Sequence, residues 1–375
     1  MPVRYHEGKF PPKTIDWQRI AKPMERATLA LARYDSFLGI IPDSSIMLSP
    51  MLVQEAVTSS RIEGTHATVS DVFLYEAGGS IDEQKSDDVL EVVNYRVALE
   101  MAEEMLKIVP LSGRLLRAAH EVLLHNVRGS LKSPGRFRTD QNWIGVSNDI
   151  SEARYIPISA ERLPDAMARW EEFVNSSDVP SLVKVAVAHA EFESIHPFCD
   201  GNGRVGRMIV PLMLYSDGVI NSPCLYLSEF FEHRNSDYQD RLLAVSRDDD
   251  WTGWCEFFLG AIETQAAENL AKAKSIFDLY QETLKIVSRK CKAEESDAAV
   301  ACMFRSAVFR SNVFVKSAGM SESSAKRLVG FLKTEKIVAE IDPHRGSRPA
   351  LLAFPKLLEI TEGLKLTSQS QANDK

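Results

Sequence analysis

SLVKVAVAHAEFESIHPFCDGNGRVGRMIVPLMLY, residues 181–215, is the stretch that decides the fold. Its first part is apolar nearly all round, so we predict a buried central helix over 181–195. A polar loop follows, and MIVPLMLY then predicts a second apolar helix, in which Pro211 is expected to cause a kink or begin a new turn. Helical periodicity dominates the remaining sequence and strand patterns are few and short, so the predicted fold class is all-α.

The loop HPFCDGNGRVGR, residues 196–207, combines side chains that suit bound phosphate. Asp200 offers an oxygen ligand suited to Mg²⁺ that bridges phosphates. Gly201 and Gly203 permit unusual backbone angles, so that consecutive N–H groups can point at phosphate oxygens where the next helix begins. His196 is suited to act as a general base, because imidazole titrates near neutrality.

Three further side chains of this loop fit the same chemistry. Asn202 can donate its side-chain amide to a phosphoryl oxygen. Arg204 and Arg207 lie three residues apart on the following helix, so both guanidinium groups can face one side and match phosphate. Taken singly, a histidine before a proline or a Gly-Asn-Gly turn is more often structural. The whole set within one short segment favours a catalytic site.

This segment resembles the signature of the Fic family, His-x-Phe-x-acid-Gly-Asn-Gly-Arg-x-x-Arg, at every defined position. The resemblance extends over roughly residues 10–260. It implies an all-helical core with a short β-hairpin flap, and a protein adenylyltransferase that binds ATP with Mg²⁺. Such an enzyme transfers AMP to a Ser, Thr or Tyr hydroxyl of a target protein or of itself and releases pyrophosphate.

The resemblance also implies roles for individual residues. His196 would deprotonate the target hydroxyl, and Asp200 would hold Mg²⁺. Arg207 would clamp the γ-phosphate, with Arg204 helping at the phosphates and in packing. Tyr238 would line the adenine pocket, although Gln239 stands where the family often has a second tyrosine. The implied ATP-binding set is Glu63, Gly201, Asn202, Gly203, Arg204, Val205, Gly206, Arg207 and Tyr238.

The stretch ARYIPIS, residues 153–159, is the best short strand candidate. It resembles the family's flap, which pairs with the backbone of the target and aligns its hydroxyl. The residues expected to bind the target are Arg154, Tyr155, Ile156 and Pro157. A plain surface hairpin is the alternative interpretation.

A capping serine followed by proline at 49–50 predicts the start of a helix that covers about 50–63 and ends at a glycine. Its last turn, SSRIEG, resembles the family's inhibitory signature. This implies that Glu63 pairs with Arg207 and blocks the seat of the γ-phosphate, with Ser59 as a hydrogen-bond partner. A carboxylate at a helix C-terminus is disfavoured by the helix dipole, which a cation would relieve. An exposed carboxylate without a role is the alternative, and a further role of Glu63 in removing AMP stays open.

Length and composition suggest two or three domains. A winged-helix-like domain is predicted near the C-terminus, because the amphipathic segment 321–337 precedes two apolar runs that flank the turn-rich DPHRGSRP. The predicted domains are an N-terminal helical region at 1–110, a Fic catalytic core at 111–289, the winged-helix-like domain at 297–365 and a polar tail at 366–375.

The net charge of −8 argues against a chain dominated by nucleic-acid contacts. From residue 300 onward, however, 12 Lys and Arg stand against 7 Asp and Glu. The alternative function is therefore a regulator that binds DNA or protein through the winged helix, with the Fic core as nucleotide sensor. DNA is not favoured, because the expected recognition helix carries one basic pair, Lys326 and Arg327, besides Lys333 and Lys336. An enzyme that transfers phosphate or phosphocholine is a further alternative.

The five cysteines are scattered and predict neither a disulfide framework nor a zinc site. The first residues lack the apolar segment of a signal peptide, and no stretch approaches the length of a membrane span. We therefore expect a soluble protein of the reducing cytoplasm that makes no membrane contact. A homo-oligomer is kept open as a partner.

Overall fold

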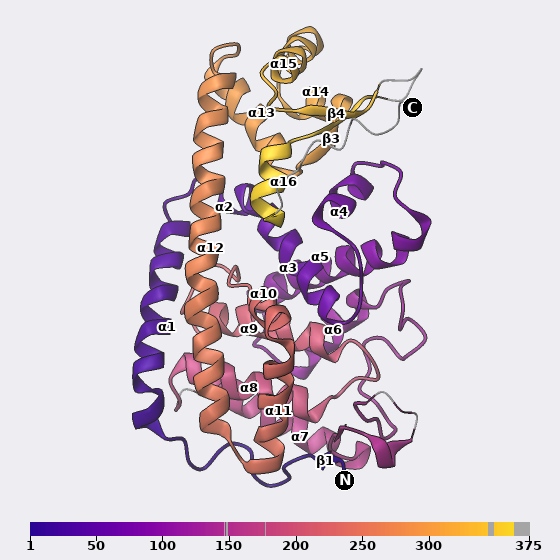
Figure 1. The fold of residues 1–375 in the computed structure, drawn as a ribbon, viewed down its shortest axis with the longest axis vertical. Coiled ribbons are helices and arrows are strands. Elements are labelled where there is room, and N and C mark those ends of the chain that lie inside the picture. The colour runs from indigo at the N-terminus through magenta and orange to yellow at the C-terminus, as the bar shows by residue number, and fades with distance from the viewer. Residues whose placement is uncertain (146, 148, 177, 344–348, 364–375) are drawn as a thin grey trace, which may run out of the picture. The chain divides into compact units, whose positions relative to one another are not determined.

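The computed structural model describes residues 1–375 except 146, 148, 177, 344–348 and 364–375. Helices dominate it, so the predicted all-α class is confirmed (Figure 1). The elements up to residue 106 are β1 (Val3–Arg4), α1 (Trp17–Leu38), α2 (Ser44–Met47), α3 (Ser49–Ile62), α4 (Val69–Glu76) and α5 (Ser86–Leu106).

The middle of the chain contains most of the long helices. Its elements are α6 (Gly113–Leu123), β2 (Tyr155–Ile156), α7 (Leu163–Val174), α8 (Ser181–Ile195), α9 (Asn202–Ser216), α10 (Ser228–His233), α11 (Asn235–Asp248) and α12 (Trp251–Val287). The last part comprises α13 (Ala293–Arg305), β3 (Val308–Arg310), α14 (Ser311–Ser317), α15 (Glu322–Thr334), β4 (Ala339–Asp342), β5 (Leu351–Ala353) and α16 (Pro355–Glu362).

The chain divides into two compact units. The first unit comprises residues 1–36, 58–65 and 90–269, and the second comprises 37–57, 66–89 and 270–375. The polar tail predicted at 366–375 lies outside the described residues, and the other predicted domain boundaries stay predictions. No helix in the described part of the chain combines the length and the apolar character needed to cross a bilayer.

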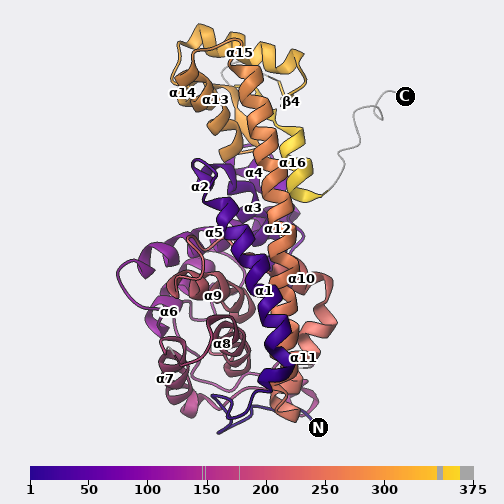
Figure 2. The same ribbon diagram turned by 90° about the vertical axis from the view of Figure 1, so that its left-hand side faces the viewer.

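Helix α8 lies in the core of the first unit, as its apolar pattern predicted. Thirteen of its fifteen residues are buried, and it packs against α7 and α9 (Figure 2). The indole N–H groups of Trp170 and Trp254 donate to backbone carbonyls of α8 at distances of 2.9 and 2.6 Å. This packing on all sides fixes the point at which the chain leaves α8 and enters the motif loop.

Helix α9 begins inside the motif rather than after it. Gly201 precedes it in the left-handed conformation, with φ 74°, which glycine adopts at no steric cost. The helix then continues through Pro211 to Ser216, so the proline does not begin a separate helix. The motif glycines therefore mark a sharp entry into a buried helix whose first N–H groups lack partners within the helix.

The strand predicted at 153–159 is shorter than expected, since only β2 forms. The reason is that its partners are short: β1 runs parallel to it over two residues on one side, and a single bridge joins Ile144 to Tyr155 on the other. The N-terminal segment is held by a buried cluster behind it. In this cluster His6 bonds Glu191 and Ser246 at 2.8 Å each, and the Tyr5 hydroxyl donates to Glu191 at 2.6 Å.

The second unit contains a three-stranded antiparallel sheet in the order β3-β5-β4, together with α13, α14 and α15. The helices and hairpin strands predicted here are present. The apolar face predicted for α15 is buried at Ala325, Leu328, Val329 and Leu332. The tip of the predicted hairpin, 344–348, lies outside the described residues, and the name winged helix stays a prediction.

Candidate active site

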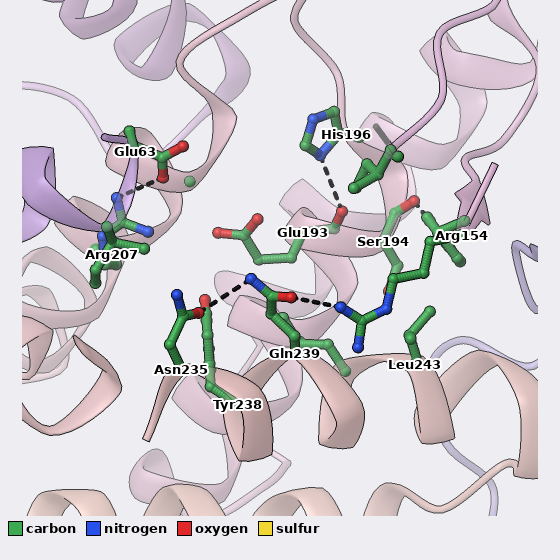
Figure 3. Close-up of a pocket in the computed structure, with 16 residues that line it drawn as sticks. Glu63, Arg154, Glu193, Ser194, His196, Arg207, Asn235, Tyr238, Gln239 and Leu243 are labelled. Atoms are coloured by element: carbon green, nitrogen blue, oxygen red, sulfur yellow. Dashed lines mark hydrogen bonds and ion pairs between the residues drawn. The ribbon is translucent and has the colours of Figure 1, made fainter. Parts of the chain in front are cut away.

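A cavity of about 400 Å³ in the first unit is lined by the end of α3, the flap, the end of α8, the start of α9 and α11 (Figure 3). It brings together seven of the predicted site residues: Glu63, Arg154, Tyr155, His196, Gly203, Arg207 and Tyr238. The remaining predicted residues lie outside its lining. They include Asp200, Asn202 and Arg204.

His196 is placed by strained backbone directly after α8. It adopts the left-handed conformation, with φ 50° and ψ 61°, which is uncommon for a residue with a side chain. The buried guanidinium of Arg138 supports this turn by donating to the carbonyls of His196 and Ile195 at 3.0 and 3.3 Å. The sequence analysis missed Arg138, because nothing in its neighbourhood shows that it reaches the end of α8.

The His196 ring is suited to accept a proton. Burial lowers the pKa of His196 to about 4, so the ring is neutral at physiological pH. Its Nδ1 lies 3.3 Å from the carbonyl oxygen of Glu193, and this contact favours the tautomer with the proton on Nδ1. The Nε2 atom then carries the lone pair that a general base needs.

Asn202 shapes the motif loop rather than reaching into the cavity. Its side chain accepts from the N–H of Phe198 and donates to the carbonyl of the same residue, both at 2.8 Å. With 2% exposure, this amide is committed to the loop. The predicted donation to a phosphoryl oxygen therefore does not fit this arrangement, although the backbone of Asn202 still begins α9.

His120 supports the other side of the same loop. Its ring stacks on Phe198 at a centroid distance of 3.8 Å, and its Nδ1 accepts from the N–H of Gly135 at 2.9 Å. Its Nε2 must then carry the proton, which it donates to the Asp200 carbonyl at 2.9 Å. Burial lowers the pKa of His120 to about 4, which keeps this arrangement neutral. The sequence analysis missed this histidine, which lies on the apolar face of α6.

Asp200 is the residue that could hold a metal ion. One carboxyl oxygen accepts from the N–H of Gly201 at 2.7 Å, and the other lies 3.3 Å from the ammonium of Lys132. Among the described residues, no group of three or more His, Cys, Asp or Glu could enclose a metal. A single carboxylate that is 26% exposed fits Mg²⁺, which proteins usually hold with one or two carboxylates together with substrate phosphates.

Arg204 forms a buried ion pair with a residue that the sequence analysis did not single out. Its Nη1 donates to Glu91 at 2.7 Å, and both side chains are 1% exposed. Its Nη2 lies 3.8 Å from Asp200. Arg204 thus serves packing and the placement of Asp200, whereas the predicted direct help at the phosphates does not fit a guanidinium that is 1% exposed and paired with Glu91.

Arg207 is paired with the end of the predicted inhibitory segment. Its Nη2 donates to a carboxyl oxygen of Glu63 at 2.7 Å and to the Ser59 carbonyl at 2.8 Å, and its Nε donates to the Ser59 hydroxyl at 2.8 Å. Although burial disfavours both charges, each lowers the cost of the other: Arg207 lowers the pKa of Glu63, and Glu63 raises the pKa of Arg207.

The Glu63 carboxylate also lies against the start of α9. A Cβ atom placed on Gly203 would be 2.3 Å from the paired oxygen of Glu63. Glycine at this position therefore lets an anion approach the first turn of the helix, where free N–H groups and the helix dipole favour negative charge. The structure brings Ser59, Glu63 and Arg207 together, and their inhibitory role stays a prediction.

Tyr238 lines the cavity from α11 and is fixed from behind. Its hydroxyl lies 2.8 Å from Nε2 of His189, whose Nδ1 lies 2.9 Å from the Gly206 carbonyl. Because a carbonyl only accepts, Nδ1 carries the proton and the Tyr238 hydroxyl donates to Nε2. The ring also stacks on Phe231 with centroids 4.4 Å apart. The cavity wall at Tyr238 is therefore rigidly held.

Two family profiles match this chain. A profile described as the N-terminal part of the Fic/DOC family matches residues 21–104, and a profile described as the Fic/DOC family matches residues 110–214. The chain belongs to the Fic/DOC family. The second match includes the whole motif loop and ends within α9.

Curated Fic relatives are similar over part of their length. The protein adenylyltransferase fic-1 of Caenorhabditis elegans is 29% identical over 87 residues, which is 22% of this chain and 16% of that protein. The protein adenylyltransferase Fic of Drosophila erecta is 28% identical over 173 residues, 44% of this chain and 32% of that protein. The chain thus spans less than a third of the length of these relatives.

Solved Fic structures share the fold. A Fic family protein from Desulfovibrio desulfuricans superposes with a TM-score of 0.59 at 21% identity, over 92% of this chain and 98% of that chain. Residues 134–508 of C. elegans Fic-1 superpose with a TM-score of 0.53 at 17% identity, over 69% and 74% of the two chains.

The flap of this Fic chain differs from the prediction in one respect. The backbone of Tyr155 is paired with Ile144 at 2.9 and 3.1 Å, and the carbonyls of Arg154 and Ile156 accept from Val3 and Tyr5 at 3.2 and 3.0 Å. Tyr155–Ile156 is thus an inner strand, which has no edge to offer to a target backbone. The target-binding role predicted for 154–157 does not fit this pairing.

Arg154 reaches across to α11. Its Nη1 donates to Gln239 at 2.5 Å (Figure 3). Its Nη2 donates to Asp240 at 2.6 Å. Gln239, which stands where the family often has a tyrosine, also donates to Asn235 at 3.0 Å. These polar contacts join the flap to α11 beside Tyr238.

Proposed function

We propose that this Fic/DOC chain is a protein adenylyltransferase. It transfers AMP from Mg-ATP to a Ser, Thr or Tyr hydroxyl of a target protein or of itself and releases pyrophosphate. The observation that carries this proposal is that a neutral His196, the glycine-lined start of α9 and Arg207 face one cavity. The similarity to relatives named protein adenylyltransferase supports the donor and the reaction.

In the proposed reaction, Nε2 of His196 takes the proton of the target hydroxyl. The oxygen of that hydroxyl then attacks the α-phosphorus of ATP, and the bond from this phosphorus to the β-phosphate oxygen breaks. The first N–H groups of α9 and the guanidinium of Arg207 hold the phosphate oxygens. Asp200 would hold Mg²⁺, which neutralises phosphate charge. Positioning and charge stabilisation supply most of the acceleration.

We further propose that Glu63 inhibits this reaction. Its carboxylate binds Arg207 and lies against the start of α9, where the γ-phosphate would bind. ATP therefore binds productively only after the Glu63 side chain has moved away. Such an arrangement keeps the buried charge of Arg207 paired in the resting state. A cytoplasmic location is part of the proposal, because it supplies ATP and agrees with five free cysteines.

The test is mass spectrometry of the full-length Glu63→Gly variant after incubation with cell lysate and, in separate reactions, ATP, GTP, CTP or UTP. We expect a mass gain of one AMP unit, on this chain or on a lysate protein, with ATP alone. The Glu63→Gly/His196→Ala variant is the control and should give no gain. A phosphate or phosphocholine adduct instead, or no adduct with any donor, would contradict the proposal.

A further inference from the structure

Glu193 lines the cavity but has no part in the reaction described above. It lies one helical turn before His196 on α8, and Figure 3 shows its carboxyl between Arg207 and His196, on the side of the cavity that faces Gln239. Its Oε1 atom is shielded from solvent and has no hydrogen-bond partner among the described residues. A buried polar atom without a partner costs free energy, so a carboxyl kept in this state calls for an explanation.

The space for this carboxyl is provided by the backbone of α9. A Cβ atom placed on Gly206 would be 2.2 Å from Oε1 of Glu193, so a side chain at 206 would displace it. Gly206 lies one turn further along α9 than Gly203, where the Glu63 carboxylate makes the same kind of approach. Two carboxyl groups therefore face successive turns of one helix: Glu63 from the end of α3 and Glu193 from the last turn of α8.

The position of Glu193 indicates which part of a nucleotide it meets. Phosphates belong at the charged end of the cavity, beside Arg207 and Gly203. Away from Arg207, and beside Arg154 in Figure 3, Leu243 offers an apolar side chain that suits a base, and its neighbour Leu242 lines the same cavity. Figure 3 shows Glu193 between Arg207 and Leu243, so a ribose that joins phosphates to a base would lie beside its carboxyl. A carboxylate only accepts hydrogen bonds and repels phosphate, whereas the ribose hydroxyls are donors.

We propose that Glu193 accepts a hydrogen bond from the 2′- or 3′-hydroxyl of the bound nucleotide and so selects ribonucleotides. This inference rests on the proposed function, since it requires a nucleotide in the cavity. Carboxylates read ribose hydroxyls in the same manner in dinucleotide-binding folds of unrelated architecture. Burial raises the pKa of Glu193 to about 7, with Arg207 opposing the rise, so the ionised acceptor is accessible near neutral pH.

The experiment compares two ligands and two proteins by isothermal titration calorimetry. The reference protein is full-length Glu63→Gly/His196→Ala, in which the cavity is open and no AMP is transferred during the titration. Against Mg-ATP, we expect Mg-2′,3′-dideoxy-ATP to bind this reference roughly tenfold more weakly, as for loss of one hydrogen bond to a charged group. Adding Glu193→Ala should reduce the ratio of the two dissociation constants, dideoxy-ATP over ATP, to about one. Glu193→Gln, which keeps a carbonyl acceptor, should give an intermediate ratio.

Two further variants separate a specific loss of ribose recognition from a general loss of affinity or folding. Leu242→Ala is the control, since it removes contact at the apolar end and should weaken both ligands by the same factor. Gly206→Ala displaces the Glu193 carboxyl without removing it and should abolish the discrimination even if Glu193→Ala fails to fold. An unchanged ratio in the Glu193 and Gly206 variants would overturn this inference and leave the proposed function standing. Failure of the reference protein to bind Mg-ATP would overturn both.

Discussion

The motif arginines of the first unit and the lysines of α15 in the second unit differ in burial, and the difference distinguishes a functional site from a solvated surface. In the first unit, Arg204 and Arg207 are 1% and 3% exposed, and each pairs with a glutamate. In the second unit, the side chains of Lys326 and Lys333 are 69% and 37% exposed, and each also pairs with a glutamate. Exposed pairs contribute little to stability, whereas a buried charge that loses its partner is costly.

The two buried arginines differ in the exposure of the glutamate that each one pairs with. The partner of Arg204 is Glu91, whose side chain is 1% exposed and lies within a long helix. The partner of Arg207 is Glu63, which is 34% exposed and follows the last residue of α3. A carboxylate that can move to solvent is exchangeable for another anion, whereas one sealed in the core is not. Arg204 is therefore structural in this comparison, and Arg207 is the arginine that a ligand can use.

The largest expected effect is at His196, whose neutral ring faces the same cavity as Arg207. In the Glu63→Gly background, His196→Ala should lower the rate of AMP transfer by about 10²–10⁴, the range typical of general base catalysis. Incorporation of radiolabelled AMP measures the rate, and an unchanged melting temperature shows that the fold is kept. Near-full transfer by the variant would remove His196 from the mechanism.

The next largest effect concerns the stability of the buried ion pair between Glu91 and Arg204, compared with an exposed pair in the second unit. Glu91→Ala leaves the Arg204 guanidinium buried without its partner, so we expect the free energy of unfolding to fall by about 3–5 kcal/mol. The matched control is Glu322→Ala, which breaks the exposed pair with Lys326 and should cost about 0.5 kcal/mol or less. Urea denaturation measures both. Equal losses for the two variants would show that burial does not separate the two units as argued.

The effect of removing Glu63 should be smaller than these. Glu63→Gly is expected to raise AMP transfer roughly 5–150-fold, the span of ordinary coupling energies between sites, because Arg207 becomes available to the γ-phosphate. Glu335→Gly is a suitable control: it also changes a glutamate that directly follows a helix, in the second unit, and should leave the rate unchanged. Equal labelling by Glu63→Gly and the unmodified chain would reject inhibition by this residue.

These predictions depend on residues that the sequence revealed to different degrees. The motif loop was predictable because its chemistry lies within twelve consecutive residues, and α8 because burial on all sides leaves an apolar run. The pairing of Glu63 with Arg207, 144 positions away, came from resemblance to a known signature. It could not have come from periodicity.

The supporting residues could not be predicted in this way. Glu91, His120 and Arg138 act through tertiary contacts, and Glu193 only lines the cavity once the chain is folded. Each stands in a sequence context typical of an ordinary helix or loop residue. The pairing of β1 with the flap could not be predicted from the sequence for a different reason. A strand of two residues is too short to show alternation, so its presence depends on the partner and on the buried His6 behind it.

The pH dependence should show a smaller effect, and its sign follows from burial. A general base must be neutral, and burial lowers the pKa of His196 to about 4, so the base stays active as the pH falls below 6.5. Glu63 raises this pKa, so its removal lowers the pKa further. We expect kcat of Glu63→Gly at saturating ATP to change less than about twofold between pH 8 and 5.5. An ordinary histidine would lose about tenfold over this range, and an inflection near 6.5 would contradict the burial argument.

The smallest effect is expected in the second unit, where the alternative function would reside. Lys326 and Lys333 of α15 are paired with Glu322 and Glu340, so their charges are partly neutralised before any phosphate arrives. We therefore expect the full-length chain to show no binding to duplex DNA at low salt by fluorescence anisotropy, and Lys326→Ala to change neither this result nor the melting temperature. Strongly salt-dependent DNA binding that Lys326→Ala weakens would contradict this expectation. It would show that exposed lysines, although each is paired with a glutamate, bind a ligand, as the comparison expects only of the buried Arg207.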